Sequence, residues 1–133
     1  MSENERFAAG RATRTEVLGE AHVARSDAGK TDFNADFIQF ITEGAWGSVW
    51  SRPGLTRRER SMITIALLAA QGHYEEVAMH VRATANTGAS AEDIKEALLH
   101  VAIYAGVPAA NQAFKVASQV LDEMSAEKMG GEK

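Results

Sequence analysis

The stretch from Gly72 to Gly88 restricts the fold most, because it has the pattern of one helix bounded by glycines. In a helix, residues three, four and seven apart share a face. One face of this stretch is apolar and consists of Tyr74, Val77, Ala78, Val81 and Ala85. The neighbouring stripe is polar and consists of His73, Glu76, His80 and Thr84. A polar stripe beside a core-facing stripe predicts a half-buried site on this helix.

Apolar residues recur at helical spacing through most of the chain. No run of alternating β-branched residues is present, and no Asn-Gly or Asp-Gly dipeptide marks a hairpin. We therefore expect an all-α domain of about six helices with short connections. The expected helices cover residues 4–24, a segment containing residues 37–41, and residues 56–71, 73–87, 90–105 and 108–127.

Two of these helices carry more apolar surface than one core-facing stripe requires. The segment Met62–Ala70 is apolar on nearly every side, which predicts a core helix buried all round. The helix at 90–105 carries Ile94 and Leu98 on one face and Leu99 and Ile103 on the other. Two apolar faces on a short helix predict a subunit interface in addition to a core contact.

Length and composition exclude several classes of protein. A chain of 133 residues fits a single domain over 1–133, and we expect about three N-terminal and six C-terminal residues to be disordered. The net charge of −4 does not favour nucleic-acid binding. The absence of cysteine excludes disulfides, thiolate catalysis and Cys-ligated metal sites. Without a signal peptide or an apolar stretch of membrane-spanning length, a soluble cytoplasmic protein is expected.

Glu76 and His80 are four residues apart, so their side chains can meet on the helix surface. They are either an ordinary surface pair or part of a catalytic site. With His73 they also present three metal-capable groups on one face. One helix rarely supplies a whole metal site, so we predict no metal.

A basic cluster beside two tryptophans is a second candidate site. It contains Arg52, Arg57, Arg58 and Arg60. Arginine can donate two hydrogen bonds to a carboxylate, so the cluster is either an anion-binding patch or a set of surface charges. Trp46 and Trp50 either wall a pocket or pack in the core. Tyr104 fits either a pocket or an interface, whereas His22 and His100 have no recognisable partner.

Several stretches together resemble the 4-carboxymuconolactone decarboxylase family. They are W-G-S-V-W-S-R-P-G-L at 46–55, R-S-M-I-T-I-A-L-L-A-A at 60–70, E-V-A-M-H-V-R-A-T at 76–84 and N-T-G-A-S-A-E-D-I-K-E-A-L-L-H-V-A-I-Y-A-G-V-P-A-A-N at 86–111. The resemblance implies an alkylhydroperoxidase D-like helical fold and assembly as a homo-oligomer, which we expect to be a homohexamer. The peroxidase branch of that superfamily uses a Cys-x-x-Cys pair, which this chain lacks. The sequence departs from the family pattern at His100, where glutamine is expected.

The resemblance also implies a reaction in the protocatechuate branch of the β-ketoadipate pathway for aromatic catabolism. There, 4-carboxymuconolactone loses carbon dioxide to give 3-oxoadipate enol-lactone, and no cofactor is expected because the substrate is its own electron sink. From this chemistry we expect His80 to act as the acid–base or oxyanion-stabilising group, oriented by Glu76. Arg52 or Arg57 would hold a carboxylate and Trp46 would wall the pocket. The alternatives are a related enzyme with another substrate and a non-catalytic helical assembly module.

Overall fold

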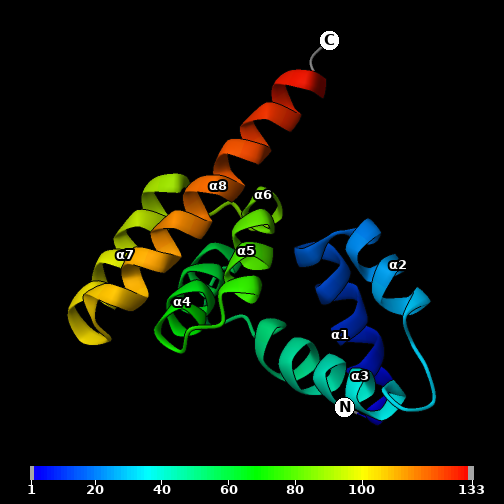
Figure 1. Cartoon of the computed structure of the whole chain (residues 1–133). Coiled ribbons are helices and arrows are strands. Elements are labelled where there is room, and N and C mark those ends of the chain that lie inside the picture. The colour runs from blue at the N-terminus through cyan, green and yellow to red at the C-terminus, as the bar shows by residue number, and fades with distance from the viewer. Residues whose placement is uncertain (1, 132–133) are drawn as a thin grey trace. The chain divides into compact units, whose positions relative to one another are not determined.

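The computed structural model describes residues 2–131, and every regular element in that range is helical (Figure 1). The elements are α1 (Glu3–Leu18), α2 (Glu20–Ala28), α3 (Ala35–Ile41), the π-helix η1 (Thr42–Trp50), α4 (Arg57–Ala70), α5 (Tyr74–Arg82), α6 (Thr84–Thr87), α7 (Ala91–Tyr104) and α8 (Val107–Gly131). The all-α prediction is confirmed, but these residues form eight α-helices where about six were expected. None of these helices combines the length and apolar character needed to span a membrane.

The helix predicted at 4–24 is two helices, because the chain turns sharply at Gly19. Gly19 has a φ of 94°, which residues with a Cβ rarely adopt. The turn brings α2 back against α1, so that Arg11 Nη2 lies 2.5 Å from Asp27 Oδ2. The prediction of one helix over 4–24 was wrong because an isolated glycine in a helical pattern does not by itself indicate a helix end.

The N-terminal unit ends at Arg57 and is held together by a close crossing of α1 and η1. A Cβ at Gly10 would overlap the backbone carbonyl oxygen of Thr42. A Cβ at Gly47 would lie only 2.6 Å from the carbonyl oxygen of Arg6. Glycine at both positions therefore allows the two backbones to touch.

The C-terminal unit begins at Arg58, and its long helix α8 packs against both α5 and α7. In Figure 1, α7 and α8 run side by side in yellow and orange. The core consists mainly of small and branched residues: Ile65, Val77, Val81, Ile94, Leu98, Val101, Ala113 and Ala117. Val77, Val81 and Leu98 are completely buried in this core.

Helix α7 begins after its N-cap residue Ser90, where the predicted helix at 90–105 was expected to start. The Ser90 hydroxyl accepts a hydrogen bond from the Asp93 backbone, and the Asp93 carboxylate accepts one from the Ser90 backbone. Arg58 donates two further hydrogen bonds to the same carboxylate. This ion pair, followed by the Ser90 backbone N–H, holds the pKa of Asp93 well below its usual range.

The helix predicted at 73–87 is interrupted at Ala83 and forms α5 and α6. Gly88 ends it with a φ of 85°, in the left-handed region that the sequence pattern indicated. Helix α8 continues past its predicted end to Gly131. Residues 1, 132 and 133, which belong to the ends expected to be disordered, lie outside the described residues.

The prediction that the core helix is buried all round was wrong. Helix α4 buries Ser61, Ile65 and Ala69, whereas Ile63 and Leu67 are 48% and 56% exposed. Only one face of α4 meets the core, and its other apolar face stays open in the single chain. The two apolar faces of α7 are confirmed, since its outer face leaves Leu99 and Ile103 exposed.

Candidate functional site

The predicted polar stripe on α5 runs from the surface to the interior. His73 caps the helix and Glu76 lies in its first turn, and both side chains are exposed. His80 lies one turn after Glu76 and is only 6% exposed, with its Nδ1 atom buried. Thr84 is also buried and donates its hydroxyl hydrogen bond to the Val81 carbonyl. His80 is therefore the one imidazole of this stripe that lies in a largely water-excluded environment.

A buried imidazole suits proton transfer, because its neutral form carries one donor nitrogen and one acceptor nitrogen. Low exposure also strengthens any charge interaction that His80 makes with a bound molecule. Glu76 stands at the rim, so its orienting role toward His80 stays a prediction. Within the part of the chain that the structure describes, no three His, Asp or Glu side chains gather as metal ligands.

The predicted arginines of the N-terminal unit are placed differently from each other. Arg57 donates from Nη1 to the backbone carbonyl of Trp50, and its Nη2 lies 3.7 Å from Glu16 Oε2. These contacts tie the segment after η1 to η1 itself and to α1. Arg52 is exposed in the loop that follows η1. Arg57 thus has a structural role whether or not it also holds a ligand.

Trp46 is 6% exposed and stacks on Trp50, with ring centroids 5.0 Å apart and planes inclined by 29°. Its backbone carbonyl accepts a hydrogen bond of 2.6 Å from the Ser51 hydroxyl, which lies 2.7 Å from the hydroxyl of Thr13. This arrangement matches the core-packing alternative for the tryptophan pair. A role for Trp46 as a pocket wall stays a prediction.

The predicted site residues are divided between the two units. His80 and Glu76 belong to the C-terminal unit, whereas Trp46, Arg52 and Arg57 belong to the N-terminal unit. Within the N-terminal unit, the structure joins Arg57 to the tryptophan pair through the Trp50 carbonyl.

Sequence reasoning missed the burial of Arg14 and did not place His22 in the α1–α2 hairpin. Arg14 is only 6% exposed and donates from Nη2 to the Ser26 hydroxyl over 3.1 Å. His22 is half-buried, and burial lowers its pKa, followed by the nearby charges of Arg14 and Arg25. The sequence signal that could have found them is Gly19, where the helix breaks and α2 folds back on α1. With one helix predicted over 4–24, nothing indicated that Ser26 contacts Arg14.

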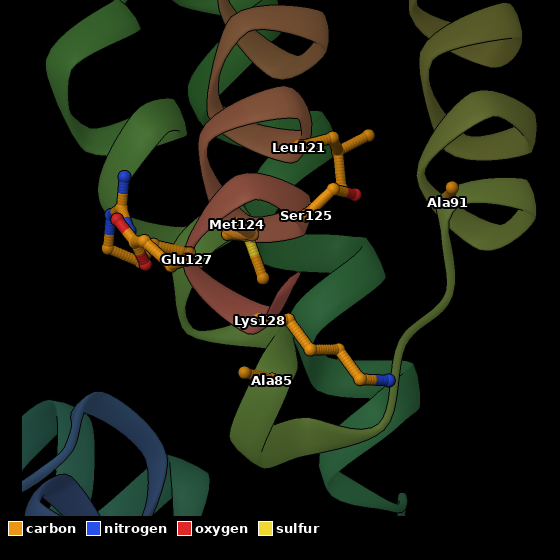
Figure 2. Close-up of a pocket in the computed structure, with 8 residues that line it drawn as sticks. Ala85, Ala91, Leu121, Met124, Ser125, Glu127 and Lys128 are labelled. Atoms are coloured by element: carbon orange, nitrogen blue, oxygen red, sulfur yellow. The ribbon is translucent and has the colours of Figure 1, made fainter. Parts of the chain in front are cut away.

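A surface cavity of about 690 Å³ lies in the C-terminal unit, along the last turns of α8. Figure 2 shows Lys128 extending from α8 toward the chain that leads into α7 at Ala91. Arg82 also lines the cavity, but its guanidinium is paired with Glu123 and Glu127. None of the predicted site residues lines this cavity.

Comparison with known proteins gives consistent results along most of the chain. Residues 35–119 match the model of the carboxymuconolactone decarboxylase family. The chain is 48% identical over 124 residues to 4-carboxymuconolactone decarboxylase from Acinetobacter baylyi, covering 93% of this chain and 92% of that protein. It is also 37% identical over 118 residues to nitrosuccinic acid decarboxylase from Metarhizium robertsii, covering 89% and 82%.

Proposed function

Because the chain belongs to the carboxymuconolactone decarboxylase family, we propose that it decarboxylates 4-carboxymuconolactone to 3-oxoadipate enol-lactone. The observation that carries the proposal is the 48% identity, over nearly the whole of both chains, to the Acinetobacter enzyme of that name. The buried imidazole of His80 supports it, since the reaction needs a protein acid near carbon. The test is release of carbon dioxide from freshly generated 4-carboxymuconolactone.

The structure of 4-carboxymuconolactone explains why side chains alone can catalyse its decarboxylation. The departing carboxylate is attached to the carbon γ to the lactone carbonyl, across the ring double bond. When the bond to carbon dioxide breaks, its electron pair moves through that double bond onto the carbonyl oxygen and forms a dienolate. Protonation of the carbon next to the carbonyl then gives the enol-lactone. The protein must hold carboxylates, stabilise the dienolate oxygen and supply the proton.

In this proposal, His80 either donates the proton or stabilises the dienolate oxygen, and Glu76 orients the His80 ring. Arg52 or Arg57 holds a carboxylate through the planar guanidinium, and Trp46 excludes water. Arg52 is the more exposed of these two arginines, so it is the more accessible to a carboxylate of a bound molecule. The cytoplasm as the compartment stays a prediction.

A second candidate within the family is decarboxylation of a different small acid. The relative from Metarhizium robertsii is named for nitrosuccinic acid, at 37% identity to this chain. Nitrosuccinic acid also has two carboxylates and a group that can accept electrons next to the departing one. The same acid and the same cationic groups would serve both reactions, so only a substrate comparison separates them.

We propose further that the chain assembles as a homohexamer through the outer faces of α4 and α7. These faces gather exposed apolar side chains: Ile63, Leu67, Leu99, Ile103 and Tyr104. Residues of both helices line one shallow cavity of about 240 Å³, so the two faces adjoin. His100 and Tyr104 stack there with centroids 6.2 Å apart. A continuous apolar surface of this kind is typical of a subunit interface.

Ile103→Glu should dissociate the assembly, because Ile103 is 77% exposed in the single chain and a buried carboxylate would lack a partner. Met129→Glu is the matched control, since Met129 is 70% exposed on α8, outside the proposed interface. Light scattering at micromolar concentration should show oligomers for the wild type and the control. A wild-type protein that remains a 14.3 kDa monomer would refute the proposal.

A further inference from the structure

Helix α3 has two apolar sides, and one of them is left exposed. Ile38 and Ile41 are partly buried where α3 packs against η1. Phe37 and Phe40 lie on another side of the same helix and are 62% and 72% exposed. Phe33, in the turn that leads into α3, is 98% exposed. The packing of α3 on η1 therefore accounts for the isoleucines and leaves three aromatic rings in solvent.

The three rings lie along one face, which we call the phenylalanine stripe (Phe33, Phe37 and Phe40). Residues four and seven apart share a face of a helix. The turn before α3 already follows helical spacing, because the Ala35 N–H donates to the Thr31 carbonyl over 2.9 Å. A contiguous exposed apolar patch of several hundred Å² is rare on a monomeric protein, and it marks a surface that another molecule covers.

The area of the phenylalanine stripe matches one half of a symmetric interface. A phenylalanine side chain buries about 150–250 Å² when it is covered completely. Weighted by the exposed fractions of its rings, the stripe offers roughly 350–600 Å² per chain. Two stripes face to face would bury about 700–1,200 Å² through the rings alone, which reaches the size of specific interfaces. A second copy of the chain brings such a stripe of its own, so the surface needs no other partner.

The charged groups beside the stripe fit the edge of such a contact. Asp32 and Asp36 are exposed neighbours of the rings in the sequence. Charged residues are depleted at the centre of an interface, whereas its rim is polar and keeps contact with water. An acidic edge also disfavours anionic partners such as nucleic acid. The stripe therefore suits an apolar protein surface.

We propose that the phenylalanine stripe is a two-fold interface, in which α3 packs against α3 of a second copy of this chain. A two-fold contact uses the same surface on both chains, so the rings of one copy meet the rings of the other. The role of the stripe in a hexamer rests on the proposed homohexamer. A hexamer with two-fold and three-fold axes contains two kinds of contact, which the stripe and the α4–α7 faces would provide separately.

Disulfide trapping tests the contact directly, because the chain has no native cysteine. Phe33→Cys, Phe37→Cys and Phe40→Cys each place a single thiol in the stripe. A disulfide forms only where the two Cα atoms come within about 7 Å of each other, so the same residue of both copies must lie near the two-fold axis. Mild oxidation of dilute protein should give a covalent dimer on a non-reducing gel for at least one of the three variants.

Met129→Cys is the matched control for trapping, because Met129 is 70% exposed on α8 and lies outside the stripe. This variant reports the covalent dimer that forms by random collision. If none of the three stripe variants exceeds it, α3 does not face α3 and the proposal is overturned. A stripe that is covered by the C-terminal unit of the same chain would give that result.

Phe37→Glu should halve the mass of the assembly, because a carboxylate would be buried between apolar rings without a partner. Phe37 is largely exposed in the single chain, so the variant should keep the helicity of the wild type. Gln39→Glu is the matched control, since Gln39 is exposed on the same helix outside the stripe, and its assembly should keep the wild-type mass. Light scattering measures the mass. An unchanged mass in Phe37→Glu would contradict the interface.

Comparison with Ile103→Glu separates this interface from the one proposed on α4 and α7. If both interfaces are present, Phe37→Glu leaves trimers and Ile103→Glu leaves dimers. A wild-type dimer that only Phe37→Glu dissociates would support the stripe and refute the α4–α7 interface. A wild-type trimer that only Ile103→Glu dissociates would support the α4–α7 interface and overturn the stripe.

Discussion

Replacing His80 by alanine is expected to slow the chemical step by about 10²–10⁴-fold, the range for loss of a general acid or base. His80 is the buried imidazole of the α5 stripe, so no exposed histidine can take its place. Because the side chain is 6% exposed, alanine would also leave a small cavity. His80→Gln keeps more of the volume while removing proton transfer, and it should lose a similar factor in turnover.

His73→Ala is the matched control, because His73 is the exposed histidine at the start of the same helix. It should retain turnover close to that of the wild type. The turnover of Glu76→Gln should fall between those of His80→Gln and His73→Ala, since the substitution removes a negative charge and keeps the shape of the side chain. Helicity and oligomer size are measured on the same samples. Turnover near the wild-type value in a folded His80→Gln protein would remove α5 from the catalytic site.

Gly10→Ala is expected to destabilise the N-terminal unit by about 1–3 kcal/mol or more, the usual cost of overpacking. The added Cβ would overlap the Thr42 carbonyl oxygen, and backbone atoms cannot rotate out of the way as a side chain can. Separation of α1 from η1 would also disturb the packing of the Trp46–Trp50 pair. The free energy of unfolding in urea measures this effect.

Gly44→Ala provides the matched control, because Gly44 lies in η1 and a Cβ there meets nothing within 4 Å. In a helix, alanine is favoured over glycine by about 0.5–1 kcal/mol, so this variant should be as stable as the wild type or slightly more stable. If Gly10→Ala and Gly44→Ala unfold at the same urea concentration, the glycine crossing does not hold the N-terminal unit together.

Local signals allowed much of the fold to be predicted. The helix start at Ser90 and the helix end at Gly88 both depend on neighbouring residues, and both are confirmed. The break at Gly19 was missed because helix-breaking there depends on the return of α2 to α1. The exposed face of α4 was missed for a different reason. An apolar pattern predicts that a helix face is buried, but it does not show whether the same chain or another chain buries it.

The candidate site was only partly accessible from the sequence. Helical spacing correctly placed His80 beside the core-facing residues Val77 and Val81, but could not show that Glu76 stays exposed. Arg14 escaped notice because its surroundings come from α2 and not from its own helix. An isolated arginine in a polar stretch gives no sign of burial until the hairpin is known.

The most direct test of the proposed function is a comparison of kcat/KM for 4-carboxymuconolactone and nitrosuccinate on the same assembled protein. Carbon dioxide release and lactone formation are followed together, with the reaction mixture without protein as the background. We predict stoichiometric carbon dioxide and enol-lactone from 4-carboxymuconolactone, with a higher kcat/KM than for nitrosuccinate. No carbon dioxide above the protein-free background, or a preference for nitrosuccinate, would contradict the proposed function.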